Sequence, residues 1–106
     1  MSLPLEGLKV LAFEQYGAGP FGSQYLSDLG AEVIKIEPAG TDGDYLRALG
    51  PYFIDEEKNS ASSIFFQALN RNKKSITLNI LSEEGKEILG KLVKESDAVC
   101  NNLRGD

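Results

Sequence analysis

The sequence predicts an α/β fold built from βαβ units around a mostly parallel sheet. Residues 8–37 contain an apolar run, a segment with helical periodicity and a second apolar run. A strand, a helix and a strand within about 30 residues form a right-handed βαβ unit, which makes the two strands parallel. The same order of elements is predicted again for residues 75–100. With 106 residues, the chain is long enough for one compact domain and too short for two.

The first βαβ unit begins with Leu8–Glu14, an apolar run rich in strand-forming residues that predicts a buried strand. A helix of about ten residues follows from Pro20, because proline suits the first helical position and Gly30 suits the position past the end. The second strand is Ala31–Glu37, which stops where Pro38 cannot continue the ladder. Apolar residues recur along the helix at a spacing of three and four positions, namely Phe21, Tyr25, Leu26 and Leu29.

The middle of the chain is less regular. Thr41–Ser63 mixes Gly, Asp, Pro and Ser with isolated aromatic residues, which predicts a long loop with a helical turn around Asp44–Leu49. Loops of this length inside a compact domain are usually functional or poorly ordered. A short strand is expected at Ile64–Leu69.

The last third of the chain predicts a strand, a helix and a strand. Ser75–Ile80 alternates as a strand does, and Ser82 is a suitable N-cap for the helix that follows, with acidic residues in its first turn. Asp97–Cys100 is expected to be another buried strand. The helix carries an apolar stripe that is expected to face the sheet, formed by Ile88, Leu89, Leu92 and Val93.

Composition excludes several classes of protein. The net charge is −5 and the basic residues gather locally rather than over a broad face, which argues against nucleic-acid binding. With one cysteine and no histidine, no internal disulfide and no soft-ligand metal site are expected. No stretch approaches the roughly 18 apolar residues of a membrane span, and the first residues do not resemble a signal peptide. We therefore expect a cytoplasmic protein that binds no metal, nucleic acid or membrane.

The sharpest local motif is Gly17–Gly22, which matches G-x-G-x-x-G between a strand and a helix, with Glu37 closing the next strand. Glycines there let backbone N–H groups approach a phosphate, and a helix N-terminus favours anions. One interpretation is a NAD-type dinucleotide site, although Pro20 removes one N–H from the turn. The other is that these residues only form a tight turn between strand and helix.

Donor side chains gather in two further places. Each group has a functional and a purely structural interpretation. The cations could clamp a phosphate or form a solvated basic turn. The residues after the last strand could line a ligand or act as caps. The two groups are Arg71, Lys73 and Lys74, and Asn101, Asn102 and Arg104.

Two carboxylates and one thiol complete the candidate residues. Glu14 and Glu37 end the first two strands, where an acid–base pair could be placed. Because neither has an identifiable histidine, serine or cysteine partner, we expect both to anchor loops. Cys100 lies in an apolar strand and is expected to be inert.

Several motifs follow one another in a fixed order along the chain. They are P-L-E-G-L-K-V-L (Pro4–Leu11), A-G-P-F (Ala18–Phe21), D-L-G-A-E-V-I-K-I-E-P (Asp28–Pro38), L-N-R-N-K-K-S-I-T-L-N (Leu69–Asn79), E-G-K-E-I-L-G-K-L-V (Glu84–Val93) and D-A-V-C-N-N-L-R (Asp97–Arg104). Together they resemble the N-terminal portion of class III CoA-transferases, the CaiB/BaiF family that includes formyl-CoA transferases. The resemblance covers residues 4–106 except the loop at 41–63.

The resemblance implies a Rossmann-like domain within a larger fold whose two subunits interlock as a homodimer. It implies transfer of CoA between carboxylic acids or, in the racemase branch, epimerisation of an acyl-CoA. The expected partners are CoA or acyl-CoA and either the remainder of the enzyme or a second subunit. The family's nucleophilic aspartate would lie beyond residue 106, so we expect no catalytic residue here and no activity from these residues alone.

The resemblance also implies a set of CoA-lining residues. We add the three cations as expected phosphate contacts because of their charge, not because of the family. Gly17 stands where formyl-CoA transferases have glutamine, and Leu103 where an aromatic residue is usual. The alternatives to a CoA-transferase are a NAD-type module and a non-catalytic interaction module. The expected CoA-binding residues are Tyr16, Gly17, Ala18, Leu78, Asn102, Leu103, Arg71, Lys73 and Lys74.

Overall fold

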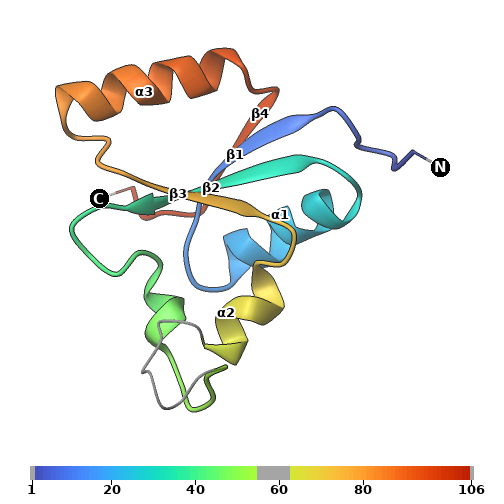
Figure 1. Ribbon diagram of the computed structural model, residues 1–106, viewed down its shortest axis with the longest axis vertical. Helices are drawn as coiled ribbons and strands as arrows, with labels where there is room; N and C mark the ends of the chain where they lie inside the picture. The colour runs from blue at the N-terminus through green and yellow to red at the C-terminus, as the bar shows by residue number, and fades with distance from the viewer. Residues whose placement is uncertain (1, 55–62, 106) are drawn as a thin grey trace.

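A parallel four-stranded sheet forms the centre of the protein (Figure 1). The computed structural model describes residues 2–54 and 63–105, and part of the predicted 41–63 loop therefore lies outside the described residues. The strand order is β3-β2-β1-β4, and every neighbouring pair is parallel, which confirms the α/β prediction. The elements are β1 (Lys9–Phe13), α1 (Ala18–Asp28), β2 (Glu32–Pro38), the 3-10 helix η1 (Tyr45–Ala48), α2 (Ile64–Leu69), β3 (Lys74–Leu78), α3 (Glu83–Lys94) and β4 (Ala98–Asn101).

Helices lie on both sides of the sheet. Figure 1 shows α3 on one side and α1 with α2 on the other. One apolar cluster, centred on Leu11, Ile34 and Ile36, packs against α3, and a second, centred on Val10, Ala12 and Val33, packs against α1. No helix in residues 2–54 and 63–105 is long and apolar enough to cross a bilayer.

The face of the sheet that α1 and α2 cover changes character along its strands. Side chains alternate between the two faces of a strand, so Val33, Lys35 and Glu37 share this face. Val33 lies near the amino end and is part of the apolar cluster, whereas Lys35 and Glu37 are charged and buried near the carboxyl end. Glu14, just past β1, is buried beside them. On this face, the core is therefore apolar at one end and ionic at the other.

Residues 64–69 form a helix, so the predicted strand at Ile64–Leu69 is wrong. Ser63 is the N-cap, and its hydroxyl accepts a hydrogen bond from the Phe66 N–H at 2.9 Å. Phe66 is buried, whereas Ile64 and Phe65 are about half exposed. The helix is only six residues long, and its sequence has no periodicity that would distinguish it from a short apolar strand.

The predicted helix after the first strand is confirmed. Leu26 packs against the apolar cluster, but most of the buried residues of the helix are polar. Phe21 and Tyr25 are more than half exposed. Ser23, Gln24 and Ser27 are buried instead, because each donates a hydrogen bond to a group outside the helix. The acceptors are the Glu14 carboxylate after β1, the Ala68 carbonyl of α2 and the Arg71 carbonyl after α2.

The last two elements are less covered than the sequence predicts. Leu89 and Leu92 of α3 pack on the sheet, whereas Ile88 and Val93 remain almost half exposed. The prediction of a buried last strand is wrong, because β4 is at the edge of the sheet and Val99 is 53% exposed. Its apolar composition therefore does not reflect burial in this chain.

Candidate functional site

The turn between β1 and α1 meets the exit of β4 at the carboxyl edge of the sheet. The Asn102 side chain accepts a hydrogen bond from the Gln15 N–H and donates one to the Gln15 carbonyl, both at 3.1 Å. The Asn102 N–H also donates to the carbonyl of Phe13. The structure thus brings together two places that are 87 residues apart in sequence, and a single amide side chain fixes the backbone of the turn.

Gly19 allows this close approach. A Cβ atom at Gly19 would lie 2.6 Å from Cγ of Asn102 and 2.8 Å from Cβ of Glu14. Gly17 is the N-cap of α1 and contributes no side-chain cap, so the first N–H groups of the helix are not capped by it. The positive end of the helix dipole is therefore directed toward this turn.

Tyr16, in the same turn, is held from the other side. Its φ angle is 64°, a left-handed conformation that is uncommon for an aromatic residue. Its N–H donates to Oδ1 of Asp44 at 3.2 Å, and its ring stacks on that of Tyr45 with centroids 5.5 Å apart. Segment 44–45 therefore completes the site. Sequence reasoning predicted a helical turn around Asp44–Leu49, which η1 confirms, but did not connect that turn with the site.

Buried ion pairs support the turn from beneath. Nζ of Lys35 lies 2.6 Å from Oδ2 of Asp44, and both side chains are almost fully buried. Nζ of Lys73 lies 2.8 Å from Oε1 of Glu14, again with both side chains buried. Asn70 joins the two pairs, since its Oδ1 accepts from both lysines. Each charge is thus paired and hydrogen-bonded, as burial requires.

Glu14 and Glu37 anchor loops, as expected from the sequence. Glu14 accepts from the Ser23 hydroxyl as well as from Lys73. Glu37 forms a two-point pair with Arg47, with both N–O distances 2.7 Å, and accepts from the Asp44 N–H. Burial alone would raise the pKa of Glu37, but its hydrogen bonds from Arg47, Ser75 and Asp44 lower the pKa to about 2. Neither carboxylate is free to act as a base.

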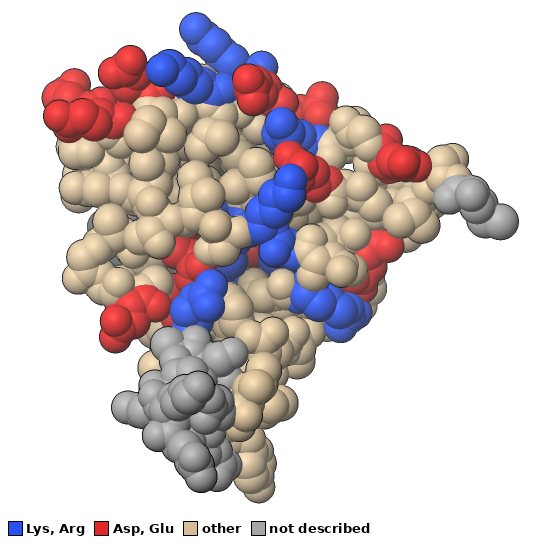
Figure 2. All heavy atoms as spheres, in the orientation of Figure 1, with Lys and Arg blue, Asp and Glu red and all other residues tan. Residues whose placement is uncertain are grey.

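The three predicted cations do not converge. Arg71 pairs with Asp28 of α1, and Lys74 pairs with Glu32 at the start of β2. Lys73 extends under the sheet to Glu14, and its burial lowers its pKa. On the face shown in Figure 2, Lys and Arg side chains lie among Asp and Glu side chains rather than in a separate basic patch. A joint phosphate clamp stays a prediction that this arrangement does not support.

The other predicted residues lie along the carboxyl edge of the sheet. Leu78 ends β3, two strands from β1 and therefore about 10 Å from the turn, and it is partly buried against the cluster beneath α3. Leu103 follows Asn102 directly and is 42% exposed. Burial raises the pKa of the Cys100 thiol, which agrees with an inert cysteine.

The glycines do not match the roles they have in a dinucleotide fingerprint. The last glycine of that fingerprint permits close packing of helix and strand. A Cβ at Gly22 would meet no atom within 4 Å, so no close packing depends on it. Of the three glycines in the motif, Gly19 is the one at which a side chain would clash, and its nearest neighbour is Asn102.

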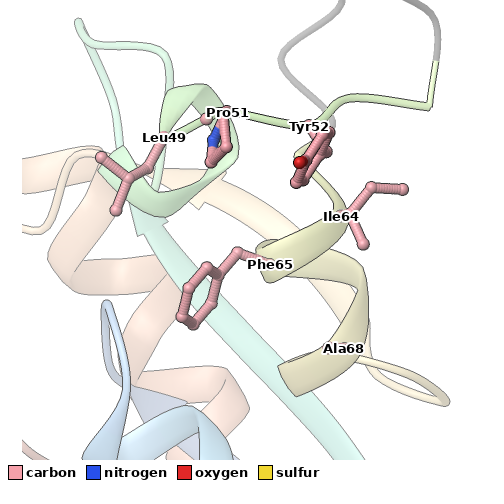
Figure 3. Close-up of a pocket in the computed structure, with 7 residues that line it drawn as sticks. Leu49, Pro51, Tyr52, Ile64, Phe65 and Ala68 are labelled. Carbon is pink, nitrogen blue, oxygen red and sulfur yellow. The ribbon is translucent and has the colours of Figure 1, made fainter.

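Cavities of contrasting polarity adjoin these elements. A polar one of about 470 Å³ lies at the carboxyl ends of β2 and β3, where Arg47 and Glu37 line it together with the hydroxyls of Ser75 and Thr77. An apolar one of about 270 Å³ lies between α2 and the segment before it, and Figure 3 shows its side chains. Its lining offers almost no polar group that could orient a ligand: Leu49, Gly50, Pro51, Tyr52, Ile64, Phe65 and Ala68.

Sequence reasoning missed Lys35 and Asp44. The signal for Lys35 was present, because a lysine two residues after Val33 in a strand falls on the same face as that valine. A charged residue on a buried face requires a partner. The partner, Asp44, could not be identified, because the loop that carries it has no periodicity to place it.

Comparison with known proteins agrees with this architecture. The sequence profile of CoA-transferase family III matches residues 5–106. Human succinyl-CoA:glutarate CoA-transferase is 46% identical over 98 residues, which are 92% of this chain and 20% of the relative. Acetyl-CoA:oxalate CoA-transferase of Acetobacter aceti is 41% identical over 101 residues, which are 95% of this chain and 24% of the relative.

Solved structures give the same result. A crystal structure of a CAIB/BAIF family protein from Brucella suis is similar with a TM-score of 0.86 and 46% identity, covering 97% of this chain and 26% of that chain. The chain thus spans about a fifth to a quarter of the length of these relatives. Profile, sequence identity and fold agree over nearly all of its residues, and the chain belongs to CoA-transferase family III.

Proposed function

We propose that this chain forms part of the CoA-binding site of an acyl-CoA:carboxylate CoA-transferase. The observation that carries the proposal is the contact between Asn102 and Gln15, which joins the β1–α1 turn to the exit of β4. In open α/β sheets, ligands bind in the crevice at the carboxyl ends of the strands. The turn, Asn102 and Leu78 all lie at this edge.

The chemistry of coenzyme A fits the residues at this edge. Its diphosphate is anionic and suits the first N–H groups of α1, which Gly17 leaves uncapped. Its pantetheine arm alternates apolar carbons with amides, which suits Leu78, Leu103 and the backbone of the turn. The row of strands from β4 to β3 is about 15 Å wide, which gives an extended ligand a continuous edge to follow.

The relatives favour a transferase over the alternatives. Those compared above are named as transferases that act on succinyl-CoA with glutarate and on acetyl-CoA with oxalate. We therefore favour CoA transfer over epimerisation as the reaction, and CoA over a nicotinamide dinucleotide as the ligand. Partners are CoA or acyl-CoA together with further parts of the enzyme or a second subunit, and we infer a cytoplasmic location.

A pair of glycine substitutions in one helix tests the proposal. Gly19→Ala should displace Asn102 and loosen the turn, and CoA affinity should fall about tenfold, the effect of losing one or two well-placed hydrogen bonds. Gly22→Ala lies in the same helix and meets no neighbour, so affinity should be unchanged. Calorimetric titration of the full-length protein with CoA measures both.

A parallel NMR titration locates the ligand through backbone amide signals. Added CoA should shift the NMR signals of Gly17, Ala18 and Asn102 in the unaltered protein. CoA at millimolar concentration that moves none of the three would refute the proposal. Titration with NAD in parallel distinguishes the dinucleotide alternative, which predicts that NAD moves them instead.

A further inference from the structure

Tyr16 has a backbone conformation that requires support from outside its own segment. Its φ angle of 64° is a left-handed value that glycine adopts readily and an aromatic residue seldom does. The residue lies in the turn that Asn102 holds at Gln15. Whatever fixes Tyr16 therefore fixes the orientation of the next backbone groups, those of Gly17 and Ala18.

Asp44 holds the Tyr16 backbone by a hydrogen bond, and Asp44 is itself fixed from several directions. Its Oδ1 accepts from the Tyr16 N–H at 3.2 Å and from the Leu46 N–H at 2.9 Å. Its Oδ2 pairs with Nζ of Lys35 at 2.6 Å, and its own N–H donates to Glu37 at 2.8 Å. The carboxylate is fully buried, so it cannot turn toward water instead.

Tyr45, the next residue, holds the Tyr16 side chain. The two rings are stacked, with centroids 5.5 Å apart and an interplanar angle of 9°. Tyr16 is 47% exposed and Tyr45 is 52% exposed, so the stack lies at the surface of the site and is not part of the core. Consecutive residues of one segment therefore hold both the backbone and the ring of Tyr16.

We propose that Asp44 and Tyr45 are positioning residues for CoA binding, which act by holding Tyr16 in its left-handed conformation. The inference rests on the proposed function, since it assigns a role within that same site. Asn102 holds the turn at Gln15 by hydrogen bonds from the β4 side, and Asp44 and Tyr45 hold it at Tyr16 from the β2 side. The N–H groups of the turn are oriented toward CoA only when both sets of contacts are present.

Substitution of Tyr45 tests the stacking contact without disturbing the core. In the full-length protein, Tyr45→Leu should weaken CoA binding roughly 2- to 12-fold, the range expected for loss of an aromatic pair. Tyr45→Phe keeps the stack and should bind within about twofold of the unaltered protein. Tyr52→Leu is the control, because Tyr52 is 70% exposed and lines the apolar cavity beside α2. Equal affinities for Tyr45→Leu and Tyr45→Phe would overturn the inference.

A double-mutant cycle tests whether Asp44 acts through the Tyr16 backbone. Asp44→Asn should reduce CoA affinity about tenfold, because a charged acceptor is replaced by a neutral one. In the Tyr16→Gly background the same change should cost little, because glycine adopts the left-handed conformation unaided. An equal loss in both backgrounds would show that Asp44 has only a general structural role, and would refute the proposal.

Two further readouts keep the outcomes distinct. The Cα chemical shift of Tyr16 reports its φ angle without any ligand, and it should change in Asp44→Asn and in Tyr45→Leu but not in Tyr52→Leu. If Asp44→Asn does not fold, the Tyr45 series alone decides. If the unaltered protein does not bind CoA, the proposed function fails and the inference fails with it. If it binds CoA and the variants bind equally well, only the inference fails.

Discussion

Glu37 shows how a single carboxylate can link the pH of the solution to the stability of the fold. It is buried at the end of β2, paired with Arg47 through both of its oxygens and hydrogen-bonded by the Ser75 hydroxyl and the Asp44 N–H. Desolvation opposes the charged form, yet these contacts prevail and lower the pKa from 4.5 to about 2. The ionised form is therefore the one that the native structure requires.

The pKa of Glu37 predicts an acid-dependent loss of stability. Because the folded pKa lies below the unfolded value, the stabilisation is complete above about pH 4.5 and is lost as the pH falls toward 2. A shift of this size corresponds to about 3 kcal/mol. Denaturant unfolding between pH 7 and pH 2 should show the unaltered protein losing its advantage over Glu37→Gln across this window.

The exposed Glu83 provides the control for that measurement. Its side chain is 89% exposed and forms a surface ion pair with Lys86, so Glu83→Gln should follow the unaltered protein closely across this pH range. If Glu37→Gln and the unaltered protein lost stability in parallel from pH 4.5 downward, the pKa of Glu37 would not be lowered in the folded protein, and the prediction would be wrong.

At the scale of elements, the start of α3 depends on one glycine. The Gly85 N–H donates to the Ser82 hydroxyl at 3.0 Å, which caps the helix. A Cβ at Gly85 would lie 1.7 Å from the carbonyl oxygen of Asn79, a backbone atom that cannot move alone. Gly85→Ala should therefore lower the free energy of unfolding by about 1–3 kcal/mol, the range for overpacking.

The second glycine of the same helix should respond in the opposite direction. A Cβ at Gly90 would meet no atom within 4 Å, so Gly90→Ala should stabilise the protein by about 0.5–1 kcal/mol through helix propensity. Guanidinium chloride unfolding of both variants gives the comparison. A stabilised Gly85→Ala variant would mean that the 79–82 turn can relax without cost.

Helices and strands with a clear sequence pattern were predicted, whereas the burial of their side chains was not. Apolar runs predicted the strands β1 and β2. The helix ends at Ser82 and Gly30 were predicted because serine is a favoured N-cap and glycine is favoured just past the end of a helix. The polar buried side of α1 was not predicted, because its hydrogen-bond partners are Glu14 and backbone carbonyls of α2 and the segment after it, which a helix pattern alone cannot reveal. The exposure of β4 was missed because strand order is a property of the whole sheet.

At the scale of the whole molecule, topology explains which parts of the site could be predicted. The glycine turn and Asn102 both follow strands, and the carboxyl ends of parallel strands meet at one edge, so their proximity follows from the fold class. Neighbouring cations carry no such constraint. The long side chains of Arg71, Lys73 and Lys74 leave their short segment in three directions, each toward a carboxylate from a different element.

The side chain of Lys73 joins several elements of the fold. Its Nζ contacts Glu14 after β1, the Pro20 carbonyl of α1, and the Leu69 carbonyl and Asn70 at the end of α2. Its side chain is 2% exposed and that of Glu14 is fully buried. Removing one partner of such a pair leaves the other charge buried without compensation, which costs about 3–5 kcal/mol. Lys73→Met should therefore be among the most destabilising single substitutions of a charged residue in this chain.

The adjacent residue supplies the matched comparison. Lys74 is 68% exposed and pairs with Glu32 at the surface, so Lys74→Met should change the free energy of unfolding far less. Denaturant unfolding followed by far-ultraviolet circular dichroism measures both variants at the same pH. The two lysines are consecutive and carry the same charge, so composition and net charge cannot separate them. Equal effects of the two substitutions would show that the buried network does not join the helices to the sheet, and that packing alone holds α1 and α2 in place.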